Sequence, residues 1–390
     1  MKYVNEFRDG KKAEQLAKLI ATEAKPEREY RLMEFCGGHT HTIFRYGIDD
    51  LLPSNIKMLH GPGCPVCVLP MKRIDAAIEL ALSPNNILCS YGDMLRVPGR
   101  ARMSLQKAKS KGADVRMIYS PAEVITIAEN EPDKKIIFFA VGFETTTPPT
   151  AVVLDQAIKS GLKNLFVFCN HVLTPPAITG ILEPAKQKNI ILLDGLIGPG
   201  HVSVVTGTLP YEKLANTYQT PITITGFEPL DILQSIYMLI KQINAGTCRV
   251  ENQYTRAVNI QGNTKAQALM SKYFELRDSF EWRGLGEMPY SAIKIKSKYA
   301  HLDAEKHFTL VERTGTDNKA CECPAVLTGQ KSPTACKLFN NPCTPENPLG
   351  SCMVSSEGAC AAYYTYRRNI KIKNVDSTNN QLRSANKHAS

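Results

Sequence analysis

The chain has 390 residues, of which 43% are hydrophobic and 22% charged, and its formal net charge is +10. This length suggests two or three domains, and the composition is typical of a soluble globular protein. No apolar run approaches the ~20 residues that a membrane helix needs, and residues 1–6 lead into a polar helix rather than a secretion signal. We therefore expect a cytoplasmic protein that does not contact a membrane.

The charge distribution limits the classes of partner, and the cysteine content indicates how the thiols are used. Residues 367–390 hold six Lys and Arg against one Asp, or +5, in a polar stretch that we predict to be a disordered basic tail. The other +5 is spread over 366 residues without a basic run, so we expect no nucleic-acid partner. Twelve cysteines without a secretion signal favour metal ligands or working thiols over a disulfide framework.

The first part of the chain alternates predicted helices and strands, and two strands run into thiol motifs. An amphipathic helix is predicted over 9–24. A strand at 32–35 runs into Cys36-Gly37-Gly38-His39-Thr40-His41, and a strand at 56–59 runs into His60-Gly61-Pro62-Gly63-Cys64-Pro65-Val66-Cys67. A helix at 70–82, a strand at 86–89 that ends shortly before Asp93, a basic helix at 102–111 and a strand at 114–119 follow.

The pattern then starts again. Strands are predicted at 135–141, 164–168, 190–193 and 222–225, with helices at 149–160, 176–187, 210–217 and from 229 to about 244. The first three strands run into Glu144, His171 and Gly198-Pro199-Gly200-His201 respectively. Beyond residue 246, a helix near 264–276 and a loop at 282–286 are the only elements that we predict before a cysteine-rich end.

Strands that alternate with helices indicate parallel sheets, so the expected fold class is α/β. We predict two doubly wound parallel-sheet domains that face a cleft, at 31–125 and 126–246, plus a small irregular iron–sulfur domain at 247–366. The helix within 1–30 is expected to pack on this C-terminal domain, and 367–390 is the tail. Because ligands bind outside the carboxyl ends of parallel strands, one rim or cleft is predicted to collect Cys36, His39, Cys64, Cys67, Asp93, Glu144, His171 and His201.

The Cys64-x-x-Cys67 pair at a predicted strand-to-helix junction is typical of a redox or metal site. A helix N-terminus favours the thiolate form, and the preceding glycines leave backbone amides free to face a ligand. The alternative is a pair of ordinary cysteines in a turn. No Walker sequence and no Gly-x-Gly-x-x-Gly occurs, so nucleotide binding lacks its usual support.

Six cysteines fall within forty residues near the end of the chain, among prolines and glycines that break regular structure. They are Cys321, Cys323, Cys336, Cys343, Cys352 and Cys360. Such a segment buries little core, so a metal centre is expected to organise it. All-cysteine ligation selects zinc or an iron–sulfur cluster, and the irregular spacing favours a [4Fe–4S] cluster. An unusual zinc site remains the alternative, and spacing alone leaves fifteen possible ligand sets.

Together these motifs resemble the HypD family of hydrogenase maturation factors, over about residues 30–366. The motifs that carry the resemblance are Cys36 to His41, Gly61 to Cys67, Gly142-Phe143-Glu144-Thr145-Thr146-Thr147-Pro148, Gly198 to Ser203, and Gly350 to Cys360. The family's cluster motif, Cys-x14-Cys-x6-Cys-x16-Cys, falls on Cys321, Cys336, Cys343 and Cys360. This resemblance implies that Cys323 and Cys352 are not ligands. Pro324, where the family would have glycine, weakens the choice between Cys321 and Cys323.

The resemblance implies a scaffold on which the Fe(CN)2(CO) group of [NiFe] hydrogenases is assembled. A HypC-type chaperone would dock beside Cys36 and hold Fe(II) jointly with it, and HypE, carrying a thiocyanate made with HypF, would deliver cyanide. The Cys64/Cys67 dithiol would supply two electrons, which the [4Fe–4S] cluster would replace one at a time.

Several polar residues of the predicted iron site have both a functional and a structural interpretation. His39 is a ligand, a proton donor or a partner of Cys36 if it is functional, and a packed structural histidine otherwise. Asp93 and Glu144 are acid/base groups or helix-capping carboxylates. His171 and His201 are expected to be structural.

Two functions of other classes compete with assembly. A free-standing iron–sulfur thiol–disulfide oxidoreductase would use Cys64 and Cys67 on a substrate disulfide, but has no need of the Cys36 motif. A nucleic-acid-binding iron–sulfur protein is suggested by charge alone.

Overall fold

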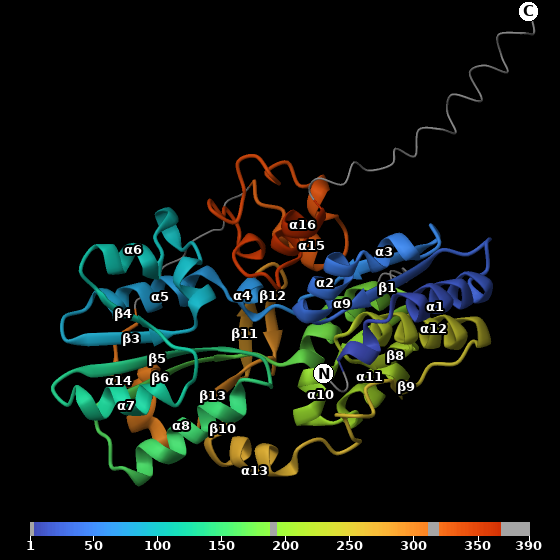
Figure 1. The fold of residues 1–390 in the computed structure, drawn as a ribbon. Coiled ribbons are helices and arrows are strands. Elements are labelled where there is room, and N and C mark those ends of the chain that lie inside the picture. The colour runs from blue at the N-terminus through green and yellow to red at the C-terminus, as the bar shows by residue number, and fades with distance from the viewer. Residues whose placement is uncertain (1–3, 188–192, 311–319, 368–390) are drawn as a thin grey trace, which may run out of the picture.

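The structure, a computed structural model, describes residues 4–187, 193–310 and 320–367. Two parallel sheets form two lobes that lie side by side, and the cysteine-rich end lies above their junction in the view of Figure 1. The tail predicted at 367–390 and the strand predicted at 190–193 fall mostly outside the described residues. None of the described helices is both long and apolar enough to cross a bilayer.

The A sheet has the strand order β2-β1-β7-β8-β9, and all four pairings are parallel. Its strands are β1 (Tyr30–Glu34), β2 (Ile56–His60), β7 (Gly195–Pro199), β8 (Ile222–Thr225) and β9 (Val250–Asn252). Alternate residues of β1 enter different cores. Leu32 packs with α1 (Gly10–Glu23) and α12 (Pro229–Ala245) on one face, whereas Met33 packs with α9 (Thr174–Gln187) and α11 (Leu209–Tyr218) on the other. Helices therefore cover both faces, as in a doubly wound sheet.

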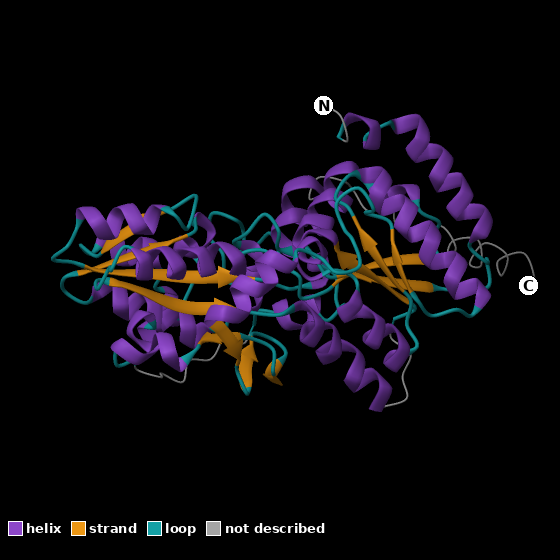
Figure 2. Cartoon of the chain, turned by 90° about the horizontal axis from the view of Figure 1, so that it is seen from below, coloured by secondary structure: helices purple, strands orange, loops and turns teal. Residues whose placement is uncertain are grey.

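The B sheet has the order β4-β3-β5-β6 and is also fully parallel. Its strands are β3 (Asn86–Ser90), β4 (Asp114–Met117), β5 (Lys135–Gly142) and β6 (Leu165–His171). Ile137 and Phe139 of β5 face one core, and Ile136 and Phe138 face the other. Figure 2 shows both sheets with helices on either side. The α/β class with two parallel sheets is thus confirmed, whereas the open cleft between them stays a prediction.

Eight of the described α-helices were predicted and lie close to their predicted ranges: α1 (Gly10–Glu23), α5 (Met71–Leu82), α6 (Leu105–Ser110), α8 (Thr147–Lys159), α9 (Thr174–Gln187), α11 (Leu209–Tyr218), α12 (Pro229–Ala245) and α13 (Thr264–Tyr273). The other eight were not predicted: α2 (Gly37–Tyr46), α3 (Ile48–Leu51), α4 (Pro65–Val68), α7 (Glu123–Asn130), α10 (Gly200–Thr206), α14 (Ala304–His307), α15 (Cys323–Leu327) and α16 (Ala359–Arg367). Two antiparallel pairs complete the fold: β10 (Phe274–Leu276) with β13 (Ile293–Ile295), and β11 (Ser279–Trp282) with β12 (Gly286–Pro289).

The predicted division into segments 31–125 and 126–246 does not match the sheets. The strands β3 and β4 join β5 and β6, while β1 and β2 join the later strands β7, β8 and β9. The B sheet is therefore inserted between β2 and β7 of the A sheet. Contiguous halves were the simplest assumption, but strand order is decided by which apolar faces pack together, and this is not visible in single strands.

The segment 247–366 is also not one unit. Strand β9 belongs to the A sheet, and β13 and α14 pack against β6 of the B sheet. Only the cysteine-rich part, from residue 320, forms the small irregular region that was expected.

Helix α1 packs on α12 rather than on the C-terminal domain, contrary to the prediction. Its side chain Ile20 is fully buried in a core shared with Ile236 and Ile240, whereas the neighbouring Leu19 is 50% exposed. The apolar stripe of α1 was read correctly from the sequence, but its partner stripe on α12 is more than 200 residues away and could not be assigned.

Replacing Ile20 by Ala should lower the free energy of unfolding by about 2–4 kcal/mol, because a buried isoleucine is removed from the α1–α12 contact. Leu19→Ala is the matched control, and should change stability by less than about 1 kcal/mol. Urea unfolding followed by circular dichroism measures both. Equal effects of the two substitutions would contradict the placement of α1.

Candidate metallocentre and redox site

Cys36 lies at the junction between β1 and α2, where it is the residue that precedes the first turn of the helix. The strand is buried on both faces, and the two-residue connection Phe35-Cys36 leads directly into the helix, which begins at Gly37. Cys36 is only 2% exposed. Burial raises the pKa of its thiol well above the usual range, and the nearby carboxylates of Glu357 and Glu34 raise it further. The thiol is therefore neutral in this closed structure.

His201 lies against the Cys36 thiol, with 3.5 Å between His201 Nε2 and Cys36 Sγ. The ring of Phe227 stacks on both His201 and His39, with centroid separations of 4.8 Å each. Burial lowers the pKa of His201 to about 4, so its imidazole is neutral at pH 7. His201 was expected to be structural, but its position makes it the histidine nearest to the thiol in the described contacts.

His39 is fully buried at the start of α2 and turned toward β8. Its Nε2 lies 3.2 Å from the carbonyl oxygen of Thr225, and Nδ1 has no hydrogen-bond partner among the described residues. Burial also lowers the pKa of His39. An Nε2–H that donates to Thr225 leaves Nδ1 as an unused acceptor, so a neutral His39 could accept a proton or a hydrogen bond from a bound group. The role of His39 stays a prediction.

Glu34 contacts residues of both thiol motifs. The Cys36 backbone N–H donates to Glu34 Oε2 (2.8 Å), His60 Nδ1 lies 2.9 Å from Glu34 Oε1, and the Thr40 hydroxyl also donates to Oε1. The carboxylate is completely buried. A buried carboxylate with three such contacts fixes the geometry of its neighbours, since each partner would otherwise lose a hydrogen bond inside the protein.

Cys64 and Cys67 form a disulfide at the start of α4, with their Cα atoms 5.3 Å apart. Strand β2, which leads to this motif, pairs with β1 so that Glu34 lies beside His60. The backbone then continues in contact: Gly37 N–H donates to Gly63 O (3.4 Å), and any side chain on Gly63 would overlap the backbone of Cys36. The structure therefore brings Cys36 and the Cys64–Cys67 pair together, as the rim argument predicted.

Five of the six C-terminal cysteines form what we call the thiol cluster: Cys321, Cys323, Cys343, Cys352 and Cys360. Cys321 Sγ and Cys323 Sγ are 3.3 Å apart. Hydrogen bonds from the thiols of Cys323 and Cys352 lower the pKa of Cys360 to about 6. Cys336, part of the ligand set implied by the resemblance, hydrogen-bonds to Glu322 instead.

The donor chemistry of the thiol cluster fits an iron–sulfur centre, because every candidate ligand is a thiol. No three Cys, His, Asp or Glu side chains of the described residues are placed to hold a single metal ion. This does not argue against a four-iron cluster, whose ligand sulfurs each bind a different iron and so lie farther apart. The set Cys321, Cys336, Cys343 and Cys360 stays a prediction.

The thiol cluster touches the disulfide through one residue. The Ser351 hydroxyl donates to the Cys67 carbonyl (2.9 Å), and Cys67 Sγ lies 4.0 Å from Ser351 O. Ser351 is the residue before Cys352, which is fully buried. Cys36, the disulfide and the thiol cluster are therefore three consecutive parts of one buried region.

The two predicted carboxylates occupy different positions. Glu144 accepts hydrogen bonds from the backbone N–H (2.8 Å) and hydroxyl (2.9 Å) of Thr174, the first residue of α9, which is a helix-capping arrangement. Asp93 forms an ion pair with Arg96 (3.7 Å), and its charge acts on Glu357. Glu357 itself packs on Gly37, directly beside the Cys36 motif.

Sequence patterns did not single out Glu34, Phe227 or Glu357. The only available signal was that each lies within or next to a recognised motif or strand end. His171 behaves as expected for a structural residue, since Nε2 lies 2.8 Å from the Thr150 hydroxyl in a fully buried setting.

Known proteins are similar to this sequence over almost its whole length. A profile of the HypD family, described as "Hydrogenase formation hypA family", matches residues 11–367. The chain belongs to the HypD family. It is 62% identical over 369 residues to the hydrogenase maturation factor HypD of Azotobacter vinelandii (94% of this chain, 97% of that protein) and 44% identical over 373 residues to that of Escherichia coli K12 (94% and 99%). Family membership gives the chain a role in hydrogenase maturation.

Glu34→Ala in this HypD family member should lower the free energy of unfolding by about 2–4 kcal/mol, because Cys36 N–H, Thr40 and His60 lose a buried partner. Glu29→Ala is the control, since Glu29 is about half exposed and bonds only to Arg31 in the described contacts. It should cost less than about 1 kcal/mol. Urea titration measures both, and a Glu34 effect no larger than the control would contradict the network.

Glu144 should make stability fall as pH rises. Burial raises the pKa of Glu144 from 4.5 to about 7, so the folded state holds a proton that the unfolded state has lost between these values. The stability contribution is complete below pH 4.5 and is lost as pH passes 7, by roughly 3 kcal/mol at most. Glu144→Gln should remove this dependence.

The comparison must be made as a difference between wild type and Glu144→Gln at each pH, by urea unfolding from pH 4.5 to 8. His171 and His201 have lowered pKa values and act in the opposite direction in part of this range, but they are common to both proteins. A difference that does not change with pH would show that Glu144 is not buried in this way.

Proposed function

We propose that this protein is a redox-active scaffold on which the Fe(CN)2(CO) group of [NiFe] hydrogenase is assembled. The observation that carries the proposal is the contact between the Cys36 motif and the Cys64–Cys67 disulfide, which in turn contacts the thiol cluster. A soft thiol for iron thus lies next to a two-electron thiol couple. Iron is the cargo here rather than a resident cofactor.

In the proposed reaction, Cys36 binds Fe(II) together with a cysteine of a HypC-type chaperone, and a HypE-type carrier, charged with thiocyanate by HypF, delivers cyanide. The carrier thiocyanate and the two thiols of Cys64 and Cys67 give the carrier thiol, cyanide, the disulfide and one proton. The carbon–sulfur bond of the thiocyanate breaks, and its two electrons come from the thiols. The disulfide in this structure corresponds to the state after transfer.

The surrounding residues prepare this chemistry. Glu34 orients Cys36 through its backbone N–H, and neutral His201 lies where one of its ring nitrogens can accept a hydrogen bond from the thiol. Cys321, Cys336, Cys343 and Cys360 would hold a [4Fe–4S] cluster, which would supply single electrons. Because Cys36 is 2% exposed, docking of the chaperone has to open this region before iron enters.

A free-standing thiol–disulfide oxidoreductase is the alternative function, and the Cys36 site speaks against it. Such an enzyme would have no use for a buried thiol with His201 Nε2 3.5 Å from its sulfur. The burial of Cys64 (3% exposed) and Cys67 (fully buried) does not separate the two functions, because a carrier thiocyanate and a substrate disulfide both have to reach these sulfurs.

Cys36→Ala should abolish iron loading while leaving the fold intact. Wild type, purified without oxygen as a complex with the chaperone, should show cyanide and carbonyl stretching bands in the infrared spectrum, and the variant should lose them. Cys248→Ala is the control, since Cys248 lies away from this region and bonds to Gln219 O. Wild-type complex without these bands, or Cys36→Ala that retains them, would refute the proposal.

A further inference from the structure

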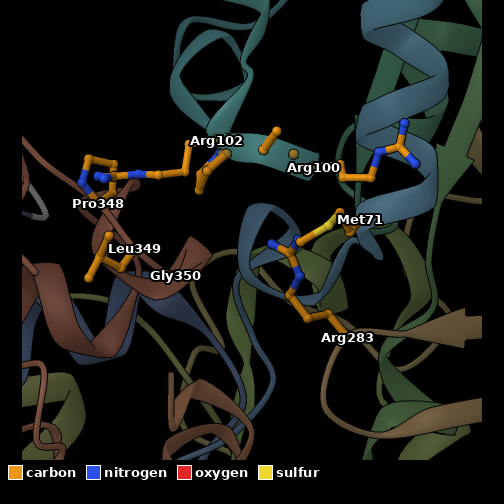
Figure 3. A pocket seen from close by; sticks show the side chains of 10 residues that line it. Met71, Arg100, Arg102, Arg283, Pro348, Leu349 and Gly350 are labelled. Atoms are coloured by element: carbon orange, nitrogen blue, oxygen red, sulfur yellow. The ribbon is translucent and has the colours of Figure 1, made fainter. Parts of the chain in front are cut away.

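A pocket lies directly outside the thiol cluster, between the cysteine-rich end and the segment 98–102. Its volume is about 260 Å3, and Figure 3 shows Arg283 beside Met71 and Arg102 directed at Pro348. A second pocket of about 410 Å3 continues it along the segment from Arg96 to Ser110. Two adjoining hollows in one surface can receive a protruding part of another protein.

The rim of these pockets is strongly basic. Six exposed cations form what we call the basic patch: Arg96, Arg100, Arg102, Lys107, Lys109 and Lys111. Residues 94–113 contain these six and no Asp or Glu. The cations are spaced along the sequence, so they form no basic run, but the fold gathers four of them at the two pockets. Glu346 is the one carboxylate among the residues that line these two pockets.

Part of the basic patch holds the cysteine-rich end in place. Arg96 donates to the carbonyl of Val354 (2.7 Å), and Arg102 donates to Asn347 Oδ1 (2.5 Å). The Arg100 and Lys111 side chains have no such role in the described contacts. Arg100 and Lys111 therefore add positive charge to the surface and do not hold the cysteine-rich end.

Residues that line the pocket contact the thiols directly. Gly350 lines the pocket, and a Cβ built on it would lie 2.7 Å from Cys323 Sγ and overlap Cys321 Sγ. Its neighbour Leu349, also in the lining, donates its backbone N–H to Cys343 Sγ (3.4 Å). The next residue, Ser351, contacts Cys67. Three consecutive residues thus connect the surface, the thiol cluster and the disulfide.

We propose that the basic patch docks a small acidic protein that delivers single electrons, and that these electrons enter through Leu349 and Gly350. The proposal rests on the proposed function, because each cyanide transfer leaves the Cys64–Cys67 disulfide oxidised. Two such donors give two electrons, and with two protons these convert the disulfide into two thiols. Charge complementarity selects the donor: an acidic surface is attracted to the four cations at the pockets and to the two others of the same segment, against Glu346 in the lining and Asp93 beside Arg96.

The test uses the full-length protein isolated without oxygen and a reduced plant-type [2Fe–2S] ferredoxin as the acidic donor. The test variant is Arg100→Glu/Lys111→Glu, which leaves the bonds of Arg96 and Arg102 intact. The control variant is Lys11→Glu/Lys18→Glu, an equal change of charge on exposed residues of α1 in the other lobe. Ferredoxin binding is measured at low and high salt. Reduction of the disulfide is measured by alkylation of Cys64 and Cys67 followed by mass spectrometry.

Wild type should bind the ferredoxin in a salt-dependent way, and the test variant should bind at least about 10-fold more weakly. Reduction by ferredoxin should slow in parallel, whereas reduction by uncharged dithiothreitol should not change. Equal affinity and equal rates for wild type and test variant, or an equal loss in the control, would overturn the proposal. Tighter binding of a 20-base-pair DNA duplex than of ferredoxin would overturn it as well.

These outcomes are separable from those of the proposed function. Ferredoxin binding that depends on the basic patch, in a protein whose complex lacks cyanide and carbonyl bands, would keep the docking surface and reject the scaffold. Normal bands in the complex, together with no effect of the test variant, would reject the docking surface alone.

Discussion

The position of β1 in the A sheet is the constraint on which the site depends. Strand β1 pairs with β2 on one side and β7 on the other, and Glu34 at its end lies beside both His60 and Ile197. The three connections that follow these strands therefore meet at one point: Cys36 after β1, the Cys64–Cys67 motif after β2, and His201 after β7. Parallel strands present their carboxyl ends at a single edge, so a shift of any one strand by a single residue would separate groups that are now in contact.

Burial then determines the charges in this site. The pKa of the Cys36 thiol is raised, the pKa values of His39 and His201 are lowered, and the pKa of Glu357 is raised. Each group is thus displaced toward its neutral form, because the loss of hydration outweighs the charges nearby, including the carboxylates of Glu34 and Asp231 that act on His39. For the Cys36 thiolate, a metal cation would supply an opposite charge. The site is consequently one in which a thiolate becomes favourable only when a cation and its ligands arrive.

The sequence was sufficient for most strands of the two parallel sheets, for eight of the helices and for the motifs, but not for their arrangement. Helix α12 and strand β8 lie within one residue of their predicted ranges, since both carry clear apolar periodicity and end at glycine. Strand β7 was not predicted, because Gly195–Pro199 contains glycines and a proline that are typical of a loop. The insertion of the B sheet into the A sheet, and hence the meeting of His201 with Cys36, depends on packing between distant segments that periodicity does not encode.

The contact between the disulfide segment and the cysteine-rich end affects how electrons can reach the disulfide. The Ser351 hydroxyl donates to the carbonyl oxygen of Cys67 (2.9 Å), whereas Cys67 Sγ lies 4.0 Å from Ser351 O. A carbonyl oxygen is the same acceptor whether the adjacent sulfurs are joined or separate, so this hydrogen bond can persist in both redox states. Reduction would then require no detachment of the thiol cluster from α4. Movement is needed instead on the other side of the disulfide, where Gly63 packs on the backbone of Cys36 and where the buried thiol must become accessible to iron.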